Sequence, residues 1–193
     1  MKKLLALICV IGLITAAGVD TVKAQSPINF GLRAGLNFAN FNDLEGDKPD
    51  SRTGIMVGGY LNFKVPMSPV SIQPEVLYTQ KGAEDSGVTI KLDYLEIPVL
   101  AKFSFAPGPA TPHVYFGPYV GFVLNSEASG GGASVDLDNT QTDFGGIVGA
   151  GLDINLGLTE LNAGVRYGFG LTDAFDGGQG KNGVLSIVAG IAL

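Results

Sequence analysis

Residues 28–38 read INFGLRAGLNF, a run in which large apolar side chains alternate with polar residues and glycines. Successive side chains of a β-strand point to opposite faces, so this period of two predicts a strand with one apolar and one polar face. Phe30 and Leu32 lie on the apolar face, whereas Asn29 and Arg33 lie on the polar one. The same alternation recurs along the chain, which favours an all-β fold.

Eight such segments, each of about ten residues or more, predict eight antiparallel strands. They cover 28–41, 53–65, 70–80, 91–105, 112–124, 142–155, 159–171 and 183–193. Short turns follow the second, fourth and sixth segments. Longer polar connections follow the odd segments, at 42–52, 81–90, 125–141 and 172–182. We therefore predict a closed eight-stranded antiparallel up-and-down transmembrane β-barrel with four external loops.

The polar face carries charged side chains that suit a narrow interior better than a lipid surface. We expect five of them to form a polar network in the lumen: Arg33, Glu75, Glu96, Lys102 and Arg166. The interior of an eight-stranded barrel is just wide enough for side chains to fill, so a plugged lumen is expected. The apolar face then contacts outer-membrane lipid.

Aromatic residues on the apolar face fall into two groups, one near each predicted membrane interface. The group expected near the short turns is Phe30, Phe63, Phe103, Phe105 and Phe116; the group near the external loops is Phe38, Tyr78, Phe122, Phe144 and Phe169. Prolines inside the strands oppose this assignment, because a closed barrel has no free edge for them. At Pro74, Pro98 and Pro118 we expect bulges or missing ladder bonds.

The first segment has the features of an export signal. Lys2 and Lys3 precede an apolar run over 4–14, and Val22-Lys23-Ala24 offers small residues for cleavage. We predict a cleaved signal peptide at 1–24 and an outer-membrane barrel domain at 25–193.

Composition and charge narrow the classes of function. Removal of residues 1–24 leaves nine basic and 17 acidic residues, a formal net charge of −8, which argues against a nucleic-acid partner. The single cysteine, Cys9, lies in the signal, so the exported chain has no disulfide. A monomer is expected, with external or periplasmic protein partners left open.

Candidate catalytic and metal sites each have a simpler interpretation. Glu75 and Glu96 lie on neighbouring strands and resemble a glycosidase acid pair, but lumenal cations are more natural partners for them. His113 begins a strand near a short turn, far from the external rim where a membrane hydrolase needs its histidine. The acidic residues of the first loop, Asp43, Glu45, Asp47 and Asp50, do not match an EF-hand. We predict no catalytic site, cofactor or metal.

Several stretches resemble the PorT-like (porin-like) outer-membrane β-barrel family of Bacteroidetes-type bacteria, over essentially the whole exported chain. They are NFGLRAGLNFANF, SIQPEVLYTQKG, LDYLEIPVLAKF, YFGPYVGF and DFGGIVGAGLDINLGL. The most specific pieces are Gln73-Pro74-Glu75 and Tyr94-Leu95-Glu96-Ile97-Pro98. The resemblance implies a barrel and not an activity, and the prolines belong to its pattern. This chain ends in Leu193, where many such barrels end in an aromatic residue.

Four classes of function are weighed on these features. A structural or interaction barrel that presents external loops is the leading hypothesis, and a barrel conducting small solutes or ions is the alternative. A membrane enzyme acting on lipids lacks catalytic partners. A soluble lipocalin-like carrier would have its apolar face inside, which the charged inner face opposes.

Overall fold

The computed structural model describes residues 28–41, 50–85, 88–105, 108–130, 133–136, 142–171 and 182–193. The predicted signal peptide and most of the acidic first loop lie outside these ranges. The strands are β1 (Ile28–Phe41), β2 (Asp50–Lys64), β3 (Val70–Asp85), β4 (Val88–Ser104), β5 (Ala110–Gly130), β6 (Ala133–Asp136), β7 (Thr142–Asn155), β8 (Glu160–Gly170) and β9 (Asn182–Ala192). Within the described residues no helix is long and apolar enough to cross a bilayer.

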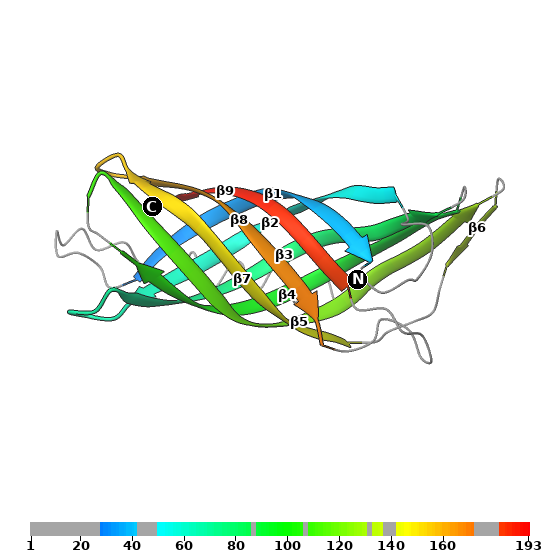
Figure 1. Ribbon diagram of the computed structural model, residues 1–193, viewed down its shortest axis with the longest axis horizontal. Helices are drawn as coiled ribbons and strands as arrows, with labels where there is room; N and C mark the ends of the chain where they lie inside the picture. Colours follow the sequence, from blue (N-terminus) through cyan, green and yellow to red (C-terminus); the bar gives the residue numbers. More distant parts are fainter. Residues whose placement is uncertain are drawn as a thin grey trace, which may run out of the picture.

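The strands form one antiparallel sheet that closes on itself (Figure 1). Its order is β4-β3-β2-β1-β9-β8-β7-β5, and a further pairing of β4 with β5 completes the ring. The first and last strands meet along a regular register from Gly31–Ala192 to Phe41–Asn182. Strand β6 pairs only with the far end of β5 and lies outside the ring. The predicted closed eight-stranded antiparallel barrel is confirmed.

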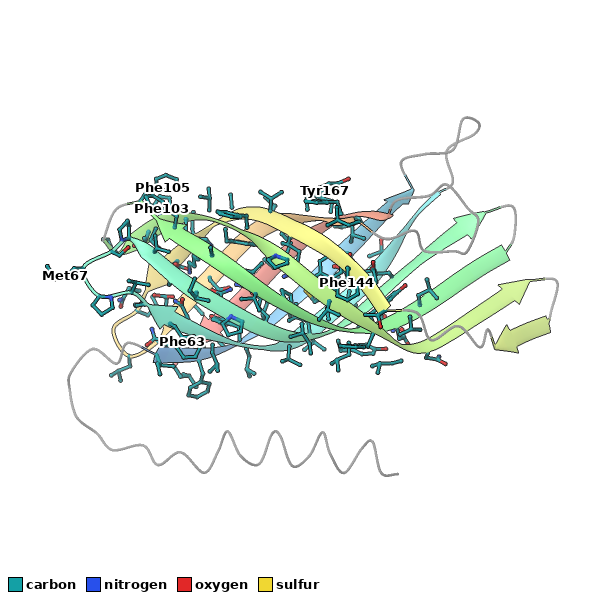
Figure 2. The ribbon with its side chains drawn as sticks, turned by 90° about the horizontal axis from the view of Figure 1, so that it is seen from below. Phe63, Met67, Phe103, Phe105, Phe144 and Tyr167 are labelled. Carbon is teal, nitrogen blue, oxygen red and sulfur yellow. The ribbon has the colours of Figure 1, made fainter. Side chains whose placement is uncertain are left out.

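Side chains alternate between the lumen and the outer surface as the period of two predicts. On β1, Leu32 is 63% exposed, whereas its neighbour Arg33 is only 3% exposed. Aromatic side chains lie on the outer surface toward both ends of the barrel. Figure 2 shows Phe63 and Phe105 near the short turns, and Phe144 toward the other end.

Two predicted loops are shorter than expected. Strand β3 runs to Asp85 and β4 begins at Val88, so most of 81–90 is a strand hairpin. Strand β5 runs to Gly130 and folds back as β6, so much of 125–141 is also strand. The sequences of 81–85 and 125–130 contain no large apolar residue, which is why the apolar alternation does not reveal these extensions. Pairing with the neighbouring strand holds them in the sheet.

The strand prolines interrupt the ladder without shifting its register. A residue in an antiparallel strand directs its N–H and C=O to the same neighbour, so proline weakens pairing on one side only. Pro118 pairs opposite Gly146 on β7, whereas pairing with β4 breaks between Tyr119 and Phe116. Of the two outcomes expected at these prolines, bulges or missing ladder bonds, the missing ladder bonds are confirmed. The register shift on β5 instead falls near Leu124, away from the prolines.

Gly117, next to Pro118, lets β5 approach β4 closely. A Cβ atom there would lie 2.0 Å from the carbonyl oxygen of Val99 and 2.9 Å from the Cα of Leu100. Both are backbone atoms, which cannot move aside like the end of a flexible side chain. Gly121, also on β5, has its nearest atoms at 3.5 Å, an ordinary contact.

We therefore expect Gly117→Ala to lower the free energy of unfolding by about 1–3 kcal/mol, because it overpacks the β4–β5 seam. Gly121→Ala is the matched control and should be neutral or slightly stabilising, since alanine is easier to order than glycine. Urea unfolding of the refolded protein in detergent micelles measures both. Equal effects of the two substitutions would contradict the close approach.

Candidate functional site

The inward positions of the strands fill the lumen with polar side chains and with apolar ones such as Leu77 and Leu100. All five side chains expected in the network are buried inside the barrel: Arg33, Glu75, Glu96, Lys102 and Arg166. They do not form one cluster. They divide into three groups along the barrel, each joined by ion pairs, and we name these the turn-side, middle and loop-side groups.

Glu75 of β3 is the centre of the middle group. Arg33 of β1 forms an ion pair with its Oε1, and Gln73 Nε2 donates to the same oxygen at 2.6 Å. Arg166 of β8 donates from Nη1 to Glu75 Oε2 at 2.9 Å. One carboxylate is thus shared by two guanidiniums from other walls of the barrel. Charge-assisted bonds of this kind are shorter and stronger than neutral ones.

Tyrosine and asparagine side chains complete the middle group. The Arg33 guanidinium carbon lies 4.9 Å from the centre of the Tyr60 ring, within the range of a cation–π contact. Asn162 Nδ2 donates to the Tyr60 hydroxyl oxygen at 2.6 Å. Arg166 also contacts the sulfur of Met56. These contacts pack both guanidiniums and leave little room beside them.

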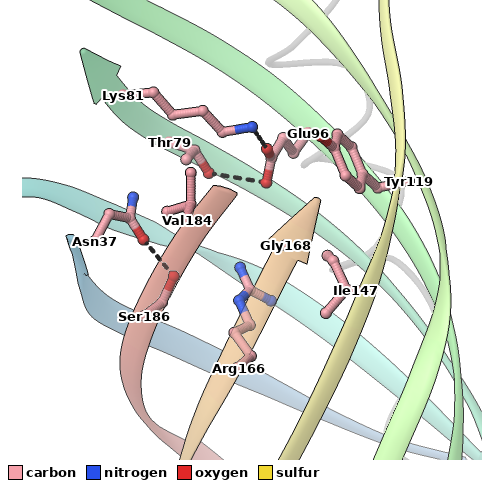
Figure 3. Close-up of a pocket in the computed structure, with 10 residues that line it drawn as sticks. All are labelled: Asn37, Thr79, Lys81, Glu96, Tyr119, Ile147, Arg166, Gly168, Val184 and Ser186. Atoms are coloured by element: carbon pink, nitrogen blue, oxygen red, sulfur yellow. Dashed lines mark hydrogen bonds and ion pairs between the residues drawn. The ribbon is translucent and has the colours of Figure 1, made fainter. Parts of the chain in front are cut away.

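The loop-side group contains Lys81, which the apolar alternation alone assigns to a loop. Lys81 forms an ion pair with Glu96, and its Nζ lies 3.7 Å from Asp143 Oδ2. The same Nζ lies 4.9 Å from the ring centres of both Tyr94 and Tyr119. Figure 3 shows Lys81 reaching Glu96 from the neighbouring strand. Lys81 occupies the next inward position of β3 after Thr79. Counting every second residue along β3 could therefore have identified Lys81 as a lumenal residue.

Thr79 and Tyr119 support the acidic side chains of the loop-side group. Thr79 Oγ1 donates to Glu96 Oε2 at 3.4 Å, and the Tyr119 hydroxyl donates to Asp143 Oδ2 at 3.1 Å. Glu96 therefore has Lys81 as its cation, and Arg166 is bonded to Glu75 instead. A cavity of about 20 Å³ separates Arg166 from this group (Figure 3), enough for roughly one water molecule.

The turn-side group joins β4, β5 and β7. Lys102 Nζ lies 2.6 Å from Asp153 Oδ2, and His113 Nδ1 lies 3.2 Å from the same oxygen. His113 is only 3% exposed, so it is a lumenal residue as well as a strand-end one. The alternation in the sequence predicts that Asp153 lies on the inner face, but it does not predict that Lys102 is its partner.

Taken together, the three groups balance in charge. Among the residues that the structure describes, the cations in these ion pairs are Arg33, Lys81, Lys102 and Arg166, and the acids are Glu75, Glu96, Asp143 and Asp153. Glu75 and Glu96 belong to different groups, and each has its own cationic partner. In the described ranges no three His, Cys, Asp or Glu side chains are grouped to hold a metal ion.

Because Glu75 holds two guanidiniums, we expect Glu75→Gln to lower the free energy of unfolding by about 3–5 kcal/mol. Arg166→Met should cost less, since Glu75 keeps Arg33 and Gln73. Glu160→Gln, a half-buried acid near the short turns, is the control and should change stability by at most about 0.5 kcal/mol. Urea unfolding in micelles measures the free energy of unfolding of the three variants and so ranks them. A larger loss in Arg166→Met than in Glu75→Gln would contradict the central place of Glu75.

Comparisons with known proteins agree with the barrel. Neisserial surface protein A matches with a TM-score of 0.55 and 20% identity, over 85% of this chain and 96% of that chain. A major outer membrane protein from Thermus thermophilus matches with a TM-score of 0.55 and 13% identity, over 86% and 98%. Ail of Yersinia pestis matches with a TM-score of 0.51 and 16% identity, over 86% and 99%. At these identities the likeness concerns the fold alone.

Among proteins with curated functions, none matches the sequence significantly. The sequence pattern of one family does match, over residues 23–176, which is most of the chain. Membership of this family indicates an outer-membrane location. The chain belongs to the outer membrane protein β-barrel domain family.

Proposed function

We propose that this protein is an anchored interaction barrel: it sits in the outer membrane as a monomer, presents its longer connections to the outside, and keeps its lumen plugged. The observation that carries the proposal is the sharing of Glu75 by Arg33 and Arg166. These three side chains come from β1, β3 and β8 and meet in the lumen. Buried charges held in this way leave no continuous water path.

The outer surface supports the membrane part of the proposal. Aliphatic side chains such as Leu36, Val165 and Ile187 are between 46% and 53% exposed on the barrel wall. Left in water, so large an apolar surface would be a liability for aggregation. Contact with lipid, with aromatic residues at both interfaces, removes that liability.

Two features refine the proposal. The Gln73-Pro74-Glu75 and Tyr94–Pro98 pieces favour the PorT-like branch of outer-membrane barrels. The ion-paired state of the lumenal acids favours a role in binding or scaffolding over catalysis. The predicted signal peptide at 1–24 would deliver the chain to the outer membrane.

Conductance in planar lipid bilayers tests the plug. Wild-type protein should conduct little, because the middle group blocks the lumen. Arg166→Ala should conduct more, since it removes one guanidinium and opens space beside the 20 Å³ cavity. Lys64→Ala, at an exposed position near the short turns, is the control and should behave as wild type. A large, steady wild-type conductance would overturn the plug and favour a solute-conducting barrel.

Orientation can be tested on whole cells with single cysteines, because the exported chain is expected to have none. Cysteine at Ser51 or Ser134 should react with an impermeant thiol reagent, since both lie in the regions expected outside. Cysteine at Ser68, in the short turn between β2 and β3, should react only after the outer membrane is broken. The reverse labelling pattern would show that the short turns face outward.

A further inference from the structure

The 20 Å³ cavity between the middle and loop-side groups has charged and polar walls. Arg166 and Glu96 both line it, and Figure 3 shows the Arg166 guanidinium pointing toward the Glu96 carboxylate. The hydroxyl-bearing side chain of Ser186 lines it as well. A cavity needs about 10–15 Å³ to hold one water molecule, so this one has room for one.

The two charged sides of the cavity have hydrogen-bonding capacity beyond their ion pairs. The Arg166 guanidinium has five N–H donors, more than its bond to Glu75 requires. The Glu96 carboxylate can accept about four hydrogen bonds. Its Oε1 is paired with Lys81, and its Oε2 accepts from Thr79 at 3.4 Å, which is a long bond. The cavity therefore lies between a group that can still donate and a group that can still accept.

A glycine on β8 keeps the cavity open. Gly168 lines it, and a Cβ atom there would have its nearest atoms at 4.0 Å, in Ile147 and Val184, which line the cavity too. A Cβ at Gly164, on the same face of β8, would instead lie 2.5 Å from the carbonyl oxygen of Ala150. Close approach of the backbone thus accounts for the glycine at 164 but not for the one at 168. The space that a side chain at 168 would fill belongs to the cavity.

We propose that this cavity binds one ordered water molecule that bridges Arg166 and Glu96. A ligand here must accept a hydrogen bond from the guanidinium and donate one to the carboxylate, and water does both. A metal cation or an ammonium ion cannot accept from Arg166, and a halide ion cannot donate to Glu96. The Ser186 hydroxyl donates to Asn37 Oδ1 at 2.8 Å, and its oxygen can accept a further bond. Three partners are typical of a buried water.

The bridge accounts for how the two groups offset their charges. The middle group has one excess positive charge, the loop-side group has one excess negative charge, and Arg166 and Glu96 are the members that line the space between them. A water held by both turns its oxygen to the cation and a hydrogen to the anion, which favours both charges. It also ties β8 to β4, three places apart in the ring. This inference goes beyond the anchor role and does not depend on whether the lumen conducts.

Nuclear Overhauser effects between water and methyl protons detect a bound water directly. The protein is deuterated except at its Ile, Leu and Val methyl groups and is refolded in deuterated micelles. Methyl groups of Ile147 and Val184 line the cavity and should show the effect, with the sign that a long-lived water gives. Leu77, which is fully buried and does not line the cavity, is the control and should show none. No effect at Ile147 and Val184 would overturn the proposal.

Gly168→Ala distinguishes a cavity that holds water from an empty one. In an empty cavity the new methyl group fills space, and alanine is easier to order than glycine, so the variant should be more stable than wild type. A bound water would instead be displaced, leaving Arg166 and Glu96 without their bridge, and the equilibrium constant for unfolding in urea should rise about tenfold. The methyl–water effect at Val184 should also disappear. Exchangeable hydroxyl protons such as that of Ser186 remain in the variant, so they cannot account for this loss.

Gly121→Ala is the matched control, because a Cβ there meets only ordinary contacts, and it should unfold like wild type or slightly later. A Gly168→Ala variant at least as stable as wild type would overturn the bridge. Gly168→Ser adds a hydroxyl that can donate and accept in place of the water, so its unfolding constant should return to within about threefold of wild type. Equal losses in the alanine and serine variants would show that added bulk is the cause, and would also overturn the bridge.

A change of salt separates water from an ion as the occupant. Replacing sodium chloride by potassium fluoride at equal ionic strength should leave the stability difference between Gly168→Ala and wild type unchanged, since the ligand is neutral. A difference that depends on the salt would assign the cavity to an ion and overturn the proposal. The plug is read by conductance and the bridge by these measurements, so failure of one proposal leaves the other standing.

Discussion

Closure of the backbone ladder is the constraint on which the rest of this structure depends. A bilayer offers no hydrogen-bond partners, so a sheet that crosses it must pair its own first and last strands. Strand β1 pairs with β9 along nearly its whole length, and β4 pairs with β5. The strand prolines are tolerated because each weakens pairing on one side only, while the register on both sides is kept.

Closure at eight strands leaves a narrow interior, and the lumenal charges follow from that narrowness. The middle group joins β3 to β8 on the opposite wall, and the loop-side group joins β3 to β7, whereas the turn-side group joins the consecutive strands β4, β5 and β7. They also help to specify register, because a slip of one residue would turn Arg33 or Glu75 toward lipid and bring an apolar neighbour inside. A buried ion pair is weak support for stability, but the cost of misplacing its charges disfavours wrong pairings of strands.

The sequence predicted the ring and its two faces well, because the period of two is local and needs no knowledge of partners. The prediction was incomplete where a strand carries no large apolar residues, because the alternating pattern is then not visible. Lys81 lies on the inward parity of β3, yet polar neighbours hid the strand there. The partners of the charges were harder still. Whether Glu96 bonds Lys81 or Arg166 depends on how far neighbouring strands are staggered, and no local pattern contains that stagger.

The middle and loop-side groups depend on each other electrostatically. The middle group holds Arg33, Arg166 and Glu75, an excess of one positive charge. The loop-side group holds Lys81, Glu96 and Asp143, an excess of one negative charge. Only the 20 Å³ cavity separates them, so each group lowers the cost of burying the other's excess. A change in one group therefore alters the stability of its neighbour. The turn-side group, in which Lys102 pairs with Asp153, is balanced on its own and takes no part in this coupling.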